Sequence, residues 1–79
     1  MAPKADISND VRRLRFEHGE MTQQQLAAAI GCTRQTVTML EQGRYVPSLA
    51  LALKIAQVFD KPVEEIFRLS QGSAFRMSG

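Results

Sequence analysis

Residues 23–44 decide the fold of this 79-residue chain, and they read QQQLAAAIGCTRQTVTMLEQGR. The stretch predicts two short helices around Gly31, with a capping-box spacing at Thr22 and Gln25 before the first and Thr33 as the N-cap of the second. Each helix has one thin apolar face, made by Leu26, Ala27 and Ile30 on the first and by Val37 and Leu40 on the second. Two such helices must cross at a steep angle to share one core, and a glycine permits the positive φ of so sharp a turn.

The rest of the chain predicts three further helices. One covers about 9–18 with Ser8 as its N-cap, one covers 49–59 with Ser48 as its N-cap, and a short one covers about 62–68. Alternating β-branched residues, which are typical of strands, are absent, so no strand is expected. The sequence therefore predicts an all-α domain of five compactly packed helices.

The length of the chain predicts one small domain. Its 79 residues are expected to divide into an N-terminal arm over 1–8, a helical domain over 9–68 and a flexible C-terminal tail over 69–79. A chain this short buries only about 60% of its unfolded surface, so an elaborate active-site cavity is not expected.

The composition argues against several classes of protein. Cys32 and His18 are the only residues of their types, so neither an internal disulfide nor a metal site is expected. The longest apolar run, 49–53, is too short to span a membrane, and the N-terminus lacks the apolar core of a signal peptide. We therefore expect a cytoplasmic protein. No nucleophile is paired with a base, so we expect no enzymatic activity, no cofactor and no small-molecule ligand.

One side of the helix that follows Thr33 is free to meet a partner. The side chains that point away from its apolar face are Arg34, Gln35, Thr38, Met39 and Gln42. Arginine can bind guanine, glutamine can bind adenine, and the methyl groups of threonine and methionine can contact thymine. Between residues 21 and 59 the only acid is Glu41. The whole chain has a net charge of +2 and a pI of about 9.1. This charge distribution favours double-stranded DNA as the partner.

A longer pattern extends beyond this helix. It consists of Thr22-Gln23, Leu26-Ala27, Ile30-Gly31, Thr33 to Val37, Leu40 to Arg44, Pro47-Ser48-Leu49, Lys54-Ile55-Ala56 and Val63 to Phe67. With these residues the chain resembles the lambda-repressor and Cro-like (Xre-type) family of helix-turn-helix regulators over about residues 9–68. The resemblance implies a five-helix domain whose third helix, about residues 34–42, enters the major groove of DNA.

The resemblance also implies a role for each matching residue. The base-reading positions are Arg34, Gln35, Thr38 and Met39. The DNA backbone is contacted by Gln23, Thr33, Gln42 and Arg44. A structural ion pair between Arg15 and Glu41 ties the first helix to the third. Met39 keeps an alternative role as a core side chain, and Thr33 has a sufficient structural role as a helix cap.

The helix over 49–59 is more apolar than one buried face requires, because nine of its eleven residues are hydrophobic. The residues expected to face the core are Leu49, Ala52, Ile55, Ala56 and Phe59. Leu51 and Val58 would then lie on another face, and we expect a homodimer that forms through Leu51, Val58 or Phe75. The alternative is that the C-terminal tail folds back over these side chains within one chain.

Together these features predict a sequence-specific, double-stranded-DNA-binding transcriptional regulator that acts as a repressor. The alternative is an antitoxin or a protein-interaction adaptor that retains the regulator fold, since a fold alone does not determine a function.

Overall fold

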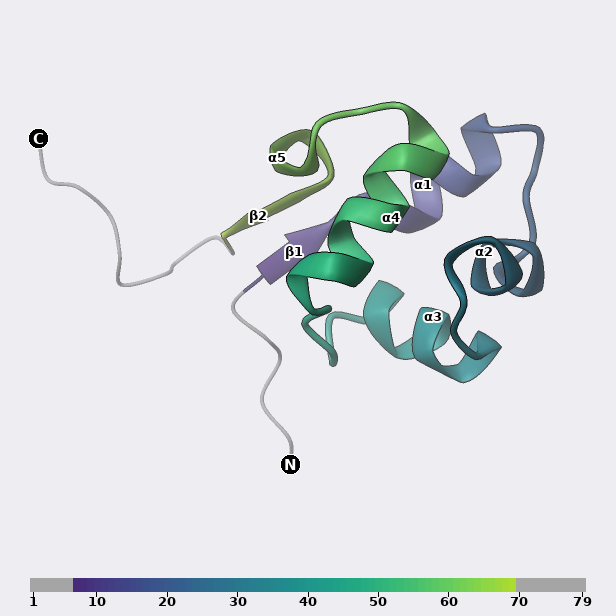
Figure 1. The fold of residues 1–79 in the computed structure, drawn as a ribbon, viewed down its shortest axis with the longest axis horizontal. Coiled ribbons are helices and arrows are strands. Elements are labelled where there is room, and N and C mark those ends of the chain that lie inside the picture. Colours follow the sequence, from purple (N-terminus) through teal and green to yellow (C-terminus); the bar gives the residue numbers. More distant parts are fainter. Residues whose placement is uncertain (1–6, 70–79) are drawn as a thin grey trace, which may run out of the picture.

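The computed structural model describes residues 7–69. Five helices and a pair of short strands follow one another along this part of the chain (Figure 1). In chain order they are β1 (Ile7–Asn9), α1 (Val11–Glu17), α2 (Gln23–Ile30), α3 (Arg34–Glu41), α4 (Leu49–Phe59), α5 (Val63–Ile66) and β2 (Phe67–Leu69).

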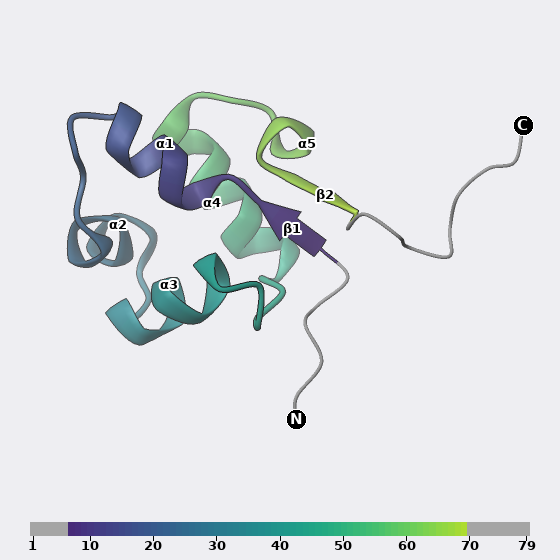
Figure 2. The same ribbon diagram turned by 180° about the vertical axis from the view of Figure 1, so that it is seen from behind.

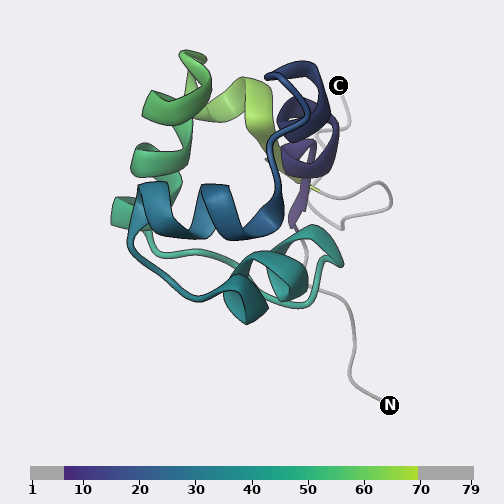
Figure 3. The same ribbon diagram turned by 90° about the vertical axis from the view of Figure 1, so that its right-hand side faces the viewer.

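The hydrophobic core draws side chains from all five helices. Its buried members are Val11, Leu14, Leu26, Ala27, Ile30, Val37, Leu40, Ile55, Phe59 and Ile66. Helix α3 lies at one edge of the molecule next to α2, and both the front and the side views show it there (Figures 1 and 3). Only one side of α3 therefore meets the core, and its other side is left at the surface.

The strand pair corrects the expectation that the chain contains no strand. β1 and β2 are antiparallel, with Ile7 opposite Leu69 and Asn9 opposite Phe67 (Figure 2). Each strand has only three residues, so neither can show the alternating pattern from which strands are predicted. The pairing involves Ile7, Ser8 and Leu69, which lie within the predicted arm (1–8) and the predicted tail (69–79).

The start of α1 also differs from the prediction. The helix begins at Val11, and the expected cap Ser8 instead lies in β1. Asp10 occupies the N-cap position without a capping hydrogen bond from its side chain, and Asn9 before it accepts a hydrogen bond from the Val11 amide through Oδ1 at 3.0 Å. Its Nδ2 donates to the Leu40 carbonyl at 3.0 Å, so that Asn9 links the start of α1 to the end of α3.

A surface ion pair connects the same region to β2. Arg68 lies 2.7 Å from the Asp10 carboxylate, and Arg13 lies 2.9 Å from it. Hydrogen bonds from Arg68 and then Arg13 hold the pKa of Asp10 below its ordinary value.

The predicted helix caps are confirmed where the signal is local. Thr22 and Gln25 form both hydrogen bonds of a capping box at the start of α2. The side chain of Thr33 accepts a hydrogen bond from the Thr36 amide, and Ser48 caps α4 in the same way. These contacts fix where α2, α3 and α4 begin.

Helix α4 buries Ala52, Ile55 and Phe59 as predicted, and Ala56 packs against the core, but the first turn of the helix differs from the prediction. Leu49 was expected in the core, but it is 72% exposed, and Leu53 on the same side is 50% exposed. Leu51 and Val58, expected on an outer face, are half-buried and pack against the core.

No helix within residues 7–69 has both the length and the apolar character needed to cross a membrane.

Gly31 is the residue on which the angle between α2 and α3 depends. It has a φ of 76° in the left-handed region, and a Cβ added there would meet no atom within 4 Å. Gly31→Ala should therefore lower the free energy of unfolding by about 1 kcal/mol, because of the backbone conformation and not because of a clash. Urea denaturation measures this loss. Gly31→Asn should lose less, since asparagine tolerates the left-handed region, and equal losses for both variants would contradict the explanation.

Candidate nucleic-acid interface

Helix α3 is held by one side and exposed on the other. Val37 and Leu40 are buried to 0% and 1% exposure, and they anchor the helix on the core. Arg34 and Gln35 are exposed, and Met39 is 38% exposed. The structure thus rejects the alternative in which Met39 fills the core.

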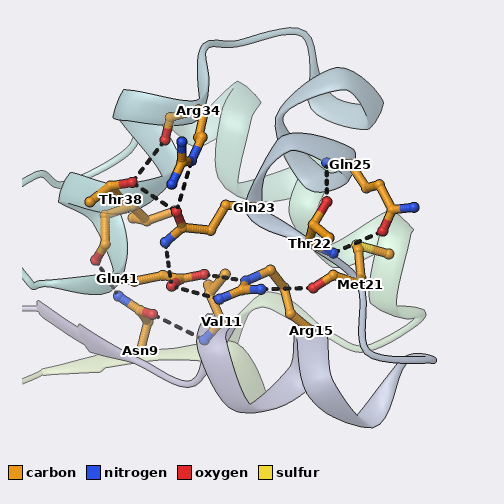
Figure 4. Close-up of polar contacts among 11 residues, drawn as sticks. Asn9, Val11, Arg15, Met21, Thr22, Gln23, Gln25, Arg34, Thr38 and Glu41 are labelled. Carbon is orange, nitrogen blue, oxygen red and sulfur yellow. Dashed lines mark hydrogen bonds and ion pairs between the residues drawn. The ribbon is translucent and has the colours of Figure 1, made fainter.

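A buried ion pair supports α3 from below (Figure 4). Arg15 Nε donates to Glu41 Oε2 at 2.6 Å and its Nη2 donates to Glu41 Oε1 at 3.1 Å, while both side chains are less than one-tenth exposed. Arg15 Nη1 also donates to the Met21 carbonyl at 2.7 Å. One arginine of α1 therefore holds both the end of α3 and the turn that precedes α2.

The side chain of Gln23 continues this network towards the surface (Figure 4). Its Nε2 donates to Glu41 Oε1 at 3.1 Å. Its Oε1 accepts from Thr38 Oγ1 at 3.0 Å and from Arg34 Nε at 3.4 Å. Gln23 thereby joins the first residue of α2 to two residues on the exposed side of α3.

The charges of this region favour an anionic partner. Glu41 is the one acid of α3, and Arg15 neutralises it. Neither Arg34 nor Arg44 forms an ion pair within residues 7–69, so both guanidinium groups remain available to a phosphate or a base. Together these charges give the exposed side of α3 and its flanks a positive character.

The structure brings most of the predicted site residues to one region. Those on or beside α3 are Arg34, Gln35, Thr38, Met39, Thr33, Gln42 and Arg44, and all but half-buried Thr38 are exposed. Gln23 joins them from α2 and is half-buried. The residues proposed for a dimer lie elsewhere, with Leu51 and Val58 on α4 and Phe75 outside the described residues.

Two contacts of this region were not anticipated from the sequence. One is the bond from Asn9 to the Leu40 carbonyl, and the other is the set of bonds from Gln23 to α3. Asn9 lies 31 residues from Leu40 along the chain, so no local pattern could have indicated the pairing.

The described residues offer little for metal or nucleophilic chemistry. No group of three or more metal-ligating His, Cys, Asp or Glu side chains occurs among them. Burial raises the pKa of the Cys32 thiol, which disfavours the reactive thiolate.

Short capped helices, a turn at Gly31 and a third helix that is exposed on one side between Arg34 and Arg44 define a helix-turn-helix DNA-binding domain. A family model described as Helix-turn-helix matches residues 12–66, and the chain belongs to this family of Xre and lambda-repressor-like regulators. It is similar to YgzD of Bacillus subtilis, an HTH-type transcriptional regulator described as uncharacterized, with 45% identity over 65 residues that cover 82% of this chain and 97% of the relative. An HTH-type regulator from Archaeoglobus fulgidus, also described as uncharacterized, is 47% identical over 57 residues, which cover 72% of this chain and 80% of that protein.

Solved structures give the same result. The restriction-modification controller protein C.AhdI of Aeromonas hydrophila has a TM-score of 0.63 and 34% identity, over 70% of this chain and 82% of that one. PlcR of Bacillus thuringiensis, solved with the peptide PapR7 and DNA, has a TM-score of 0.61 and 30% identity, over 67% of this chain and 18% of PlcR. The chain is a DNA-binding transcription regulator, and this class is not a class of enzymes.

The buried pair generates a prediction about stability. Glu41→Ala should lower the free energy of unfolding by about 3–5 kcal/mol, because it leaves the Arg15 guanidinium buried without its carboxylate. Chemical denaturation measures the change. Glu17→Ala is the control, since it breaks an exposed pair with Arg13 and should change stability within experimental error. Similar losses of unfolding free energy in both variants would show that the buried Arg15–Glu41 pair contributes no more to stability than the exposed pair.

Proposed function

We propose that this regulator binds specific sequences of double-stranded DNA with α3 in the major groove, and that it acts as a repressor. The observation that carries the proposal is the exposed side of α3, which presents donors and methyl groups while its one acid is turned inward and neutralised. An α-helix of this kind fits the width of the major groove. The membership of the lambda-repressor-like family supports the repressor role. Because it acts on DNA, we assign the protein to the cytoplasm.

The base-reading residues in this proposal are Arg34, Gln35, Thr38 and Met39. Arg34 and Gln35 stand at the first turn of α3, where a recognition helix reaches base edges first. Thr38 and Met39 lie one turn further along, and their methyl groups suit contact with thymine.

The backbone-contacting residues in this proposal are Gln23, Thr33, Gln42 and Arg44. Gln23 and Thr33 stand at the starts of α2 and α3, where free backbone amides also favour a phosphate. Gln42 and Arg44 flank the other end of α3 and are exposed. PlcR, a structural relative, has been solved with DNA, and this supports a DNA-facing role for the corresponding region here.

We also propose that the protein works as a homodimer. Leu49 and Leu53 are four residues apart on α4, both at least half exposed, and Val46 before them is 50% exposed. Such an apolar group at the surface suits an interface, and it supports Leu49 and Leu53 as contact residues more strongly than the half-buried Leu51 and Val58. A two-fold dimer would place two copies of α3 about 34 Å apart, on successive turns of a palindromic operator.

The roles of two arginines should be separable by measurement. Arg34→Ala should relax specificity at one position of each half-site by about 1–3 kcal/mol, because a base contact is lost. Arg44→Ala should weaken binding to all sequences alike and reduce the salt dependence by about one phosphate contact. Selection of bound sites from random duplexes, followed by titrations at several salt concentrations, tests both. If Arg34→Ala left the selected sequence unchanged, the proposed placement of α3 would be wrong.

The dimer is tested through its apolar surface. Replacing Leu49 and Leu53 together by Glu should convert the dimer to a monomer, because two buried charges oppose association. Sedimentation equilibrium over a range of concentrations measures the mass. Lys54→Glu is the control for a changed charge on the exposed surface of α4 away from the line of Leu49 and Leu53. A monomer mass for the unsubstituted protein at every concentration would contradict the proposal.

A further inference from the structure

The geometry points to Glu41 as a positioning residue for base recognition: through the amide of Gln23 it orients Arg34 and Thr38 on the reading side of α3. The inference rests on the proposed function and adds to it, because it connects a buried ion pair to sequence discrimination. Glu41 itself would not touch DNA, since its side chain is 6% exposed.

The first step is the orientation of the Gln23 amide. An ionised carboxylate only accepts hydrogen bonds, so Glu41 Oε1 requires the NH₂ end of the amide, which lies 3.1 Å from it. The carbonyl oxygen of Gln23 must then point away from Glu41, towards Arg34 and Thr38 in the earlier part of α3 (Figure 4). Arg15 binds both oxygens of Glu41 and prevents the carboxylate from turning.

The second step concerns Arg34. Its Nε lies 3.4 Å from Gln23 Oε1, and neither of its Nη groups is hydrogen-bonded within residues 7–69. A guanidinium held at Nε keeps its two terminal nitrogens as a free fork. These are the donors that a bidentate contact with guanine O6 and N7 uses. Gln23 can therefore orient the guanidinium of Arg34 through Nε and leave both Nη groups free to bind a base.

The third step concerns Thr38. Its Oγ1 lies 3.0 Å from Gln23 Oε1 and 3.1 Å from the carbonyl of Arg34. The hydroxyl has a single hydrogen, which these two acceptors on the protein side share, so χ1 is restrained. The restraint sets where the methyl group of Thr38 is presented to a base.

The fourth step is that phosphate binding does not disturb this arrangement. The NH₂ group of Gln23 has two hydrogens, and one bond to Glu41 leaves the second free. Beside it lies an open surface hollow lined by Thr22, Gln23 and Arg34, with the carboxylate residue Glu20 also in its lining. A phosphate oxygen in this hollow can accept the second hydrogen while the Gln23 oxygen still holds α3, so Glu41 also determines where that donor points.

The experiment is a double-mutant cycle read out as discrimination. The variants are Glu41→Gln, Gln23→Ala and the two together, and Glu17→Gln is the control that makes the same chemical change on an exposed carboxylate. The dissociation constant is measured for the selected duplex and for a duplex changed at the base pair that Arg34→Ala identifies. The ratio of the two constants is the discrimination.

The expected result is that Glu41→Gln lowers this ratio on the order of tenfold, since a neutral amide no longer fixes the direction of Gln23. Gln23→Ala should lower it equally, and the double variant should show no further loss. Glu17→Gln should leave the ratio unchanged. If Glu41→Gln weakens both duplexes equally, or if its effect on the ratio adds to that of Gln23→Ala, then Glu41 has only a structural role and the inference is overturned.

A second variant covers the case in which Glu41→Gln does not fold. Gln23→Glu keeps the acceptor oxygens but replaces the donor by a charge that Glu41 repels, so it should lose discrimination, whereas Gln24→Glu on the exposed surface should weaken binding without changing the ratio. Equal ratios in these two variants would also overturn the inference. If the unsubstituted protein showed no discrimination at all, the proposed function would fail first.

Discussion

Burial of the Arg15–Glu41 ion pair is the constraint on which the rest of this small structure depends. Two charges removed from water are stabilising only when their geometry is good and their remaining hydrogen-bonding groups are satisfied. Here the contact is bidentate, and the Met21 carbonyl and the Gln23 amide take up further groups. Within residues 7–69 no buried side-chain nitrogen or oxygen lacks a partner. The pair can therefore fix α1, α2 and α3 relative to one another in a domain with a modest core.

The same pair determines the electrostatics of the exposed side of α3, which we propose meets DNA. A carboxylate on α3 would repel phosphates if it pointed outward, and a helix without it would lose its tie to α1. Because Glu41 points inward, its charge is neutralised by Arg15 and does not face the surface. The same contact ties α3 to α1. The cations that remain, Arg34 and Arg44, have no such partner in residues 7–69 and give the surface its positive character.

Contacts between the two ends of the described chain close the domain. β1 and β2 pair beside α1, the Asp10 amide donates to the Ile66 carbonyl at 3.1 Å, and Arg68 reaches the carboxylate of Asp10. A short fifth helix such as α5 has too few residues to be stable alone. Its burial of Ile66 and its continuation into β2 hold it against the start of α1.

The sequence by itself determined the features that depend on neighbours within one turn. The caps at Thr22, Thr33 and Ser48, the apolar spacing of Val37 and Leu40, and the turn at Gly31 all act over three or four residues, so α2, α3, α4 and the outward side of α3 were predictable. Only the tertiary structure decided the strand pair, the exposure of Leu49 at the start of α4, and the bonds by which Gln23 reaches Glu41 and Thr38. Each of these joins residues 15 or more apart or depends on how a helix packs on its neighbours, and local propensity contains no information about such contacts.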